Sequence, residues 1–258
     1  MRLRIGLALC ASACLAMVWP ANAITNGQPD GNGHPYVGTV IQFIPNTDLI
    51  SICSGSALSA TRFLTAAHCA DPALPVFVTY KNAPPYSLAN DFVQGTFFVD
   101  PNWCPGCGPG LKGADSHDEA VVALSKAVDP GGFAALPAAG LVDTLPMNLP
   151  IDLVGYGVQG FVHGGGKPQQ LFLFTRYVAA TLLVQSNDSL ADQQIKLTAN
   201  PSQSKGGICF GDSGGPDLIA GTRTIIGINS FVLNNSCSGI TYSQRIDKAD
   251  ILAFITGV

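Results

Sequence analysis

The sequence predicts an all-β fold. Short apolar runs rich in Val, Ile, Phe and Thr recur between clusters of Gly, Pro, Asn and Asp. Such spacing is typical of antiparallel strands in barrels or sandwiches, and not of alternating strand and helix units. The expected strands lie in the runs Val37–Ile44, Val76–Tyr80, Phe92–Val99, Ala120–Leu124, Ile151–Tyr156, Leu171–Leu183 and Thr224–Phe231.

One helix is expected, at the C-terminus. Only the segment Lys248–Thr256 has helical spacing, which places Ile251, Leu252 and Ile255 on one face. We expect Asp247 to cap the start of this helix, because an aspartate at that position can accept hydrogen bonds from the first backbone amides.

Residues 1–23 predict a cleaved signal peptide. Two arginines form its positive start, Ile5–Trp19 its apolar middle and Ala21–Ala23 the small-residue cleavage site. The apolar stretch is shorter than the roughly 20 residues that a spanning helix needs, and Pro20 closes it. We therefore expect a secreted domain over residues 24–258, released to the periplasm or the extracellular space, with no membrane contact after cleavage.

The composition argues against a nucleic-acid-binding surface. The whole chain has a formal net charge of −4, and loss of a signal that carries two arginines and no acidic residue changes it to −6. A nucleic-acid surface would need clustered lysine and arginine. No segment after the signal is long and apolar enough to cross a membrane. We expect a soluble protein that uses no cofactor and no metal.

Six cysteines remain after signal cleavage, and an even number in an exported chain suggests three disulfides. Cys104 and Cys107 stand beside Trp103 in a C-x-x-C pair, a spacing shared with thioredoxin-like redox sites and with half of a zinc site. The Gly108–Gly110 segment that follows cannot readily start a helix to lower a thiol pKa. The sequence therefore favours a local disulfide. The other cysteines are Cys53, Cys69, Cys209 and Cys237.

Gly211–Pro216 (GDSGGP) places a serine among glycines, where backbone amides can approach a substrate carbonyl. The segment also fits the G-x-S-x-G nucleophile turn of α/β-hydrolases, which is the rival interpretation. Those enzymes place their histidine after the serine, whereas all the histidines of this chain precede Ser213. An esterase of that kind would have no base. The histidines are His34, His68, His117 and His163, and we expect only His68 to be catalytic.

Leu64–Cys69 (LTAAHC) supplies that histidine, and Asp118 stands at the start of an apolar strand. Asp115 is the other candidate for the catalytic acid, but only Asp118 is followed by alanine at the second position and then by an apolar run. The order His, Asp, Ser is that of chymotrypsin. With LTAAHC and GDSGGP intact and their His and Ser 145 positions apart, the sequence resembles the trypsin and chymotrypsin family of serine proteases over nearly all of the mature chain. The resemblance implies two six-stranded antiparallel β-barrels, divided near residues 130–150, and a C-terminal α-helix.

The resemblance also implies the role of each site residue. Ser213 would attack the carbonyl, His68 would accept its proton and return it to the leaving amine, and Asp118 would hold the imidazole. The amides of Gly211 and Ser213 would form the oxyanion hole, and Ser230 would steady Asp118. Its partners would be protein or peptide substrates and proteinaceous inhibitors.

Two disulfides follow from the same resemblance, Cys53 with Cys69 and Cys209 with Cys237. The loop closed by Cys104 and Cys107 would overhang the substrate cleft just before Asp118. Glu119 departs from the family, which usually has an aliphatic residue at that position.

The family's new amino terminus folds inward and pairs with the aspartate before the catalytic serine, which here implies Ile24 and Asp212. Because the predicted cleavage site abuts Ile24, we hypothesise that signal cleavage itself releases the activating terminus.

The resemblance places the floor of the specificity pocket at Gly207, six residues before the serine. An acidic floor is absent, so cleavage after Lys or Arg is not expected. Ile208 would line the pocket, Val232 would narrow its entrance and Gly239 would stand on the opposite wall. We expect a preference for small or medium aliphatic residues. The sequence thus predicts a secreted serine endopeptidase, and the alternative is a catalytically silent homologue that acts as a binding module.

Overall fold

The computed structural model describes residues 23–47, 49–108, 110–162, 169–186 and 190–258. The predicted signal peptide, apart from Ala23, lies outside these residues, and so does His163. Within the described part of the chain, no helix has the length and apolar character needed to span a membrane.

The first barrel closes in the order β2-β3-β4-β7-β6-β5, with every neighbouring pair antiparallel. Because strand β2 pairs with both β3 and β5, the sheet has no open edge. Its strands are β2 (Val37–Phe43), β3 (Ile50–Ala57), β4 (Arg62–Thr65), β5 (Val76–Thr79), β6 (Val93–Val99) and β7 (Ala120–Leu124).

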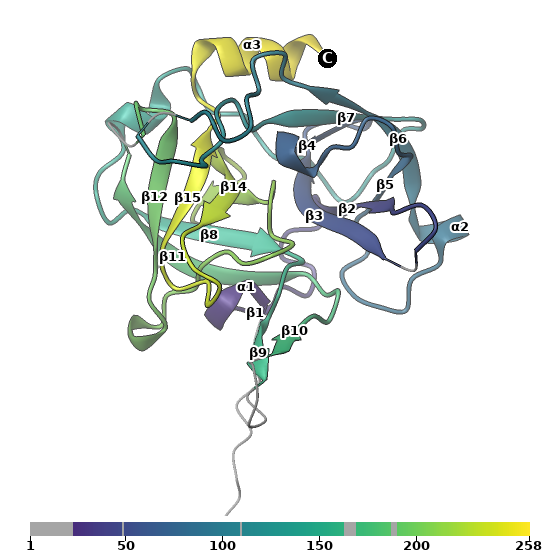
Figure 1. Ribbon diagram of the computed structural model, residues 1–258, viewed down its shortest axis with the longest axis horizontal. Coiled ribbons are helices and arrows are strands. Elements are labelled where there is room, and N and C mark those ends of the chain that lie inside the picture. Colours follow the sequence, from purple (N-terminus) through teal and green to yellow (C-terminus); the bar gives the residue numbers. More distant parts are fainter. Residues whose placement is uncertain (1–22, 48, 109, 163–168, 187–189) are drawn as a thin grey trace, which may run out of the picture.

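The second barrel follows the order β11-β12-β15-β14-β13-β8 and closes through the pairing of β8 with β11. Its strands are β8 (Pro150–Gly155), β11 (Tyr177–Gln185), β12 (Gln194–Ala199), β13 (Pro216–Ile219), β14 (Ile225–Val232) and β15 (Gly239–Arg245). The short β1 (Gln28–Pro29) pairs with β11, and β9 (Gly160–Val162) pairs with β10 (Gln169–Leu171). The expected fold of two six-stranded antiparallel barrels is therefore confirmed, and Figure 1 shows them side by side.

Helices are few and short in the described chain. They are α2 (Leu88–Asp91), the C-terminal α3 (Ala249–Gly257) and single 3-10 turns at Ala67–Cys69, Leu141–Thr144 and Pro201–Gln203. The element α1 (Ala23–Asn26) is one irregular turn in which Ile24 and Thr25 have non-helical dihedral angles. The expected C-terminal helix is confirmed, and its Ile251 and Ile255 are buried.

Two local expectations are wrong. Asp247 does not cap α3, because its carboxylate accepts the amide of Val142 at 2.8 Å and pairs with Arg245 at 2.9 Å. The run Leu171–Leu183 is not one strand, since β10 ends at Leu171 and β11 begins at Tyr177. The amide of Arg176 donates to the carbonyl of Asn82 in the first barrel, so this amide does not pair with a neighbouring strand of the second barrel.

A shared hydrophobic core joins the two barrels. Val37 and Leu64 of the first barrel pack in one cluster with Val154 and Ile228 of the second, and Ile255 of α3 belongs to the same cluster. Each barrel also has an interior cluster of its own. Because the barrels are held by this common core, residues from both can meet in one site.

Candidate active site

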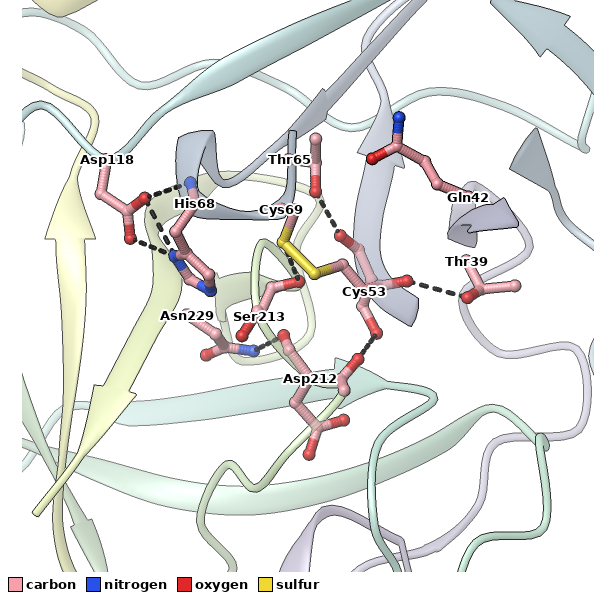
Figure 2. The surroundings of a disulfide bond; sticks show 12 residues. Thr39, Gln42, Cys53, Thr65, His68, Cys69, Asp118, Asp212, Ser213 and Asn229 are labelled. Atoms are coloured by element: carbon pink, nitrogen blue, oxygen red, sulfur yellow. Dashed lines mark hydrogen bonds and ion pairs between the residues drawn. A yellow bond between two sulfur atoms is a disulfide. The ribbon is translucent and has the colours of Figure 1, made fainter. Parts of the chain in front are cut away.

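The pairing of β4 with β7 places His68 against Asp118. Thr65 is opposite Ala120 in this antiparallel ladder, so the segments that follow β4 and precede β7 lie side by side, and the Ala67 amide donates to the Asp118 carbonyl at 3.2 Å. His68 Nδ1 lies 2.8 Å from Asp118 Oδ2, and the His68 amide donates to Asp118 Oδ1 at 3.0 Å. The carboxylate therefore fixes both the backbone and the ring of His68 (Figure 2).

Asp118 is fully buried and receives further support from the second barrel. The Ser230 hydroxyl on β14 donates to Asp118 Oδ2 at 2.6 Å, and the Asp118 amide donates to Gln244 Oε1 at 3.4 Å. Burial lowers the pKa of His68, but the charge of Asp118 and its hydrogen bond raise it, and the result lies above the ordinary 6.5. An imidazole held by a buried carboxylate can serve as a proton acceptor.

Ser213 lines the same pocket as His68. Figure 2 shows its side chain beside the imidazole, on the side away from Asp118. The Ser213 carbonyl accepts the amide of Ser54 at 2.8 Å, which ties the serine loop to β3 of the first barrel. Unlike Asp118, Ser213 is partly exposed, so a substrate can reach it.

Hydrogen bonds to the preceding carbonyls orient two backbone amides around Ser213. The Phe210 carbonyl accepts the amide of Val158 at 2.8 Å, so the Gly211 N–H of the same planar peptide points the opposite way. The carbonyl of Asp212 likewise accepts Asn229 Nδ2 at 3.0 Å, which orients the Ser213 N–H. Gly211 has φ of 94°, a conformation that disfavours residues with a side chain.

Ser54 is a site residue that sequence reasoning missed. Its buried hydroxyl donates to the Gly211 carbonyl at 2.9 Å and accepts the Tyr156 amide at 2.9 Å. These bonds link the serine loop to both barrels. Asn229 was missed for the same reason, because neither residue belongs to a motif and both act through contacts that only the packed barrels create.

The family is established by comparison with known proteins. A family model described as Trypsin matches residues 26–253. The chain belongs to the trypsin family. The predicted family resemblance is therefore confirmed.

No curated protein matches the sequence. Among solved structures, HL collagenase is similar with a TM-score of 0.68 and 20% identity, over 90% of this chain and 98% of that one. Human heparin binding protein is similar with a TM-score of 0.62 and 16% identity, over 90% of this chain and 95% of that one. At these identities the likeness shows the fold alone.

Asp212, the residue before the serine, is buried in the manner expected of a trypsin-family loop. Its two carboxylate oxygens accept the amides of Gly157 at 2.8 Å and Cys209 at 2.9 Å. A Cβ at Gly157 would lie 2.5 Å from the Asp212 carboxylate carbon, so only glycine allows this approach. Within the described residues no cation pairs with Asp212, and burial raises its pKa to about 7.

Ile24 is fully buried in the core of the second barrel. The next residue, Thr25, bridges to Gly207, with the Gly207 amide donating to the Thr25 carbonyl at 3.2 Å. Because the chain continues into Ala23, the nitrogen of Ile24 is here a peptide amide and carries no charge. The predicted ion pair with Asp212 is therefore not formed in this uncleaved chain.

A pocket of about 220 Å³ opens beside His68 and Ser213. Of the residues expected to set specificity in a trypsin-family enzyme, Ile208 and Val232 line it. Phe210 and Phe231, which the sequence did not indicate, line it as well. A small pocket walled by apolar side chains suits an apolar group.

The other two expected pocket residues lie elsewhere. Gly207 is buried, and a Cβ there would meet the Cβ of Ala199 at 2.3 Å. Gly239 is exposed with φ of 96°, and a Cβ there would meet nothing within 4 Å.

Among the described residues three disulfides are present, and they join Cys53 to Cys69, Cys104 to Cys107 and Cys209 to Cys237. The first lies beside His68 (Figure 2). Asp115 stabilises the Cys104–Cys107 loop, since it accepts the Gly106 amide at 2.8 Å and the Trp103 indole N–H at 3.3 Å. Asp118, and not Asp115, makes the hydrogen bonds to the ring of His68.

Proposed function

We propose that this trypsin-family chain is a secreted serine endopeptidase with His68, Asp118 and Ser213 as its catalytic triad. The observation that carries the proposal is the hydrogen bond between Asp118 and His68 Nδ1, with His68 and Ser213 lining one pocket. This bond sets the tautomer in which Nε2 can accept a proton.

The reaction follows from this arrangement. Ser213 Oγ attacks the substrate carbonyl carbon while its proton passes to His68 Nε2, and the carbonyl oxygen takes up the negative charge. The amides of Gly211 and Ser213 donate to that oxygen. His68 then gives its proton to the leaving amine, the C–N bond breaks, and a water molecule hydrolyses the acyl-enzyme by the same path.

The pocket supports cleavage after small or medium aliphatic residues. Ile208 and Val232 line it and no acidic side chain does, so a lysine or arginine would find no counter-charge there. A peptide library should give cleavage after aliphatic residues. Preferred cleavage after basic residues would contradict this specificity.

Activation by signal cleavage fits the burial of Ile24 and Asp212. A free amine at Ile24 would supply the cation that Asp212 lacks among the described residues. Export and cleavage would then produce an active enzyme with no separate zymogen stage. N-terminal sequencing of the secreted protein tests this, since a start other than Ile24 with full activity would contradict it.

A covalent serine-directed probe tests the peptidase assignment. The wild-type protein should be labelled, Ser213→Ala should not, and the variant should lose turnover by about a millionfold. Ser202→Ala, at an exposed serine of the 3-10 turn Pro201–Gln203, is the matched control and should label normally. Absence of labelling in the wild type would favour the binding module instead.

A further inference from the structure

Three ionisable side chains converge next to Asp118. Asp100 directly follows β6 and Glu119 directly precedes β7, and the antiparallel register places Val99 opposite Ala120. The Asp100 amide donates to the Glu119 carbonyl at 3.2 Å, so the two acidic residues face each other at the end of this ladder. His117, with φ of 50°, brings its ring to the same point.

The ligand atoms of this cluster are close together. His117 Nδ1 lies 3.6 Å from Glu119 Oε1 and 3.9 Å from Asp100 Oδ2. One nitrogen and two carboxylate oxygens all lie within 4.8 Å of one another. Ligands about 2.1 Å from a tetrahedral Zn²⁺ would be about 3.4 Å apart, so small rotations of these side chains would complete the geometry.

Glu119 is the most unusual member. It is fully buried, and neither of its carboxylate oxygens has a hydrogen-bond partner among the described residues. His117 Nδ1 is also buried without such a partner. The ion pair of Glu119 with His117, at 3.6 Å, is too long for a hydrogen bond. Burying a carboxylate that accepts no hydrogen bond is costly, and native proteins rarely leave such groups unsatisfied. A cation held between the three side chains would satisfy both groups.

The chemistry of the donors indicates the class of ion. Ca²⁺ and Mg²⁺ prefer oxygen ligands alone, whereas one imidazole with two carboxylates suits Zn²⁺ and similar transition ions. The His117 side chain is 19% exposed, so one member of the cluster reaches solvent. Asp250 at the start of α3 adds negative charge near His117.

We propose that Asp100, His117 and Glu119 bind one divalent ion of the zinc class. Because His117 and Glu119 flank Asp118 in the chain, a bound ion would fix the backbone on both sides of the residue that holds His68. The site would thus stabilise the first barrel at the position where the triad begins. Neither the donors nor their geometry depends on the proposed peptidase activity.

Zinc titration of the Ser213→Ala protein tests the site without interference from proteolysis. After dialysis against a chelator, calorimetry should show one Zn²⁺ per chain. The melting temperature should rise with zinc, because an ion at a hundred times its Kd multiplies the folding equilibrium constant by about 100. Absence of stoichiometric binding at micromolar zinc, or tighter binding of Ca²⁺, would overturn the proposal.

Two variants locate the ion. His117→Asn keeps a residue that tolerates positive φ and should weaken zinc binding at least tenfold. Glu119→Gln should weaken zinc binding by the same amount. If Glu119→Gln fails to fold, the zinc affinity of His117→Asn alone tests the site. His68→Ala is the control, because His68 also lies near two carboxylates, those of Asp115 and Asp118. Zinc binding that is lost in His68→Ala and kept in His117→Asn would overturn the assignment.

Discussion

Ser54→Ala tests whether the serine loop is held in place from the first barrel. The substitution removes a hydroxyl that donates to the Gly211 carbonyl and accepts the Tyr156 amide, both at 2.9 Å. Each backbone group left unpaired in the interior costs about 1–3 kcal/mol, so with two such groups we expect the free energy of unfolding to fall by about 2–6 kcal/mol. The Gly211–Asp212 peptide, which lies between the peptides that carry the two proposed oxyanion donors, should lose its fixed orientation at the same time.

The kinetic effect should be separable from the stability effect. Loss of one oxyanion donor costs about 10²–10³ in kcat, and Ser54→Ala only loosens the peptide between the two proposed donors, so we expect kcat to fall by about 10–100-fold with KM nearly unchanged. Steady-state kinetics on a peptide substrate, at a temperature where the variant is fully folded, measures this. Thermal unfolding of the same samples gives the change in stability.

Ser56→Ala is the matched control for this experiment. Ser56 lies two residues further along β3 and is buried, but its hydroxyl has no hydrogen-bond partner among the described residues. Its removal should leave kcat and stability nearly unchanged. If Ser54→Ala loses stability while kcat stays at the wild-type value, or if both variants lose kcat equally, the reasoning about Ser54 is refuted.

Three further predictions concern the triad and the buried acid. Asp118→Asn should lower kcat by about 10⁴, the size known for the equivalent change in this family, and a fall below tenfold in steady-state kinetics would contradict its role. Because Asp118 raises the pKa of His68, the acid limb of the kcat/KM profile should lie above pH 6.5, and a midpoint below that value would contradict the assignment. In the uncleaved chain, Asp212 has a pKa raised from 3.8 to about 7, so its contribution to stability is present at acid pH and is lost as the pH rises through about 7. Thermal unfolding against pH should show this loss in the precursor and not in a chain that starts at Ile24, and identical profiles would contradict the ion pair.

The apolar runs of the sequence indicated β2, β5, β6, β7, β8, β11 and β14, but they did not indicate β3, β4, β12, β13 or β15. β15 was missed because Ser243, Gln244 and Arg245 make its sequence polar, although all three are fully buried. Arg245 is accommodated by its ion pairs with Asp247 and Asp143, each 2.9 Å long. Hydropathy cannot reveal such a strand, because its stability depends on partners from distant parts of the chain.

In the candidate site, too, some residues could be inferred from the sequence and others could not. His68 and Ser213 stand in compact motifs whose glycines and small residues shape the local backbone, so their identity could be inferred from the sequence. The choice of Asp118 over Asp115 also followed from the apolar strand beside it. Ser54 could not be inferred, since its contacts reach segments that are far apart in the sequence. The cluster around Glu119 could not be inferred either, since it depends on the register between β6 and β7.

By itself the sequence determined the all-β class, the trypsin-family membership and the segments that carry the candidate triad, because these depend on local patterns of apolar, small and motif residues. Only the tertiary structure decided which polar groups are paired, where the pocket lies and which acid is left without a partner. Those outcomes depend on the closure of two barrels and their shared core, which bring distant residues into contact and remove them from water.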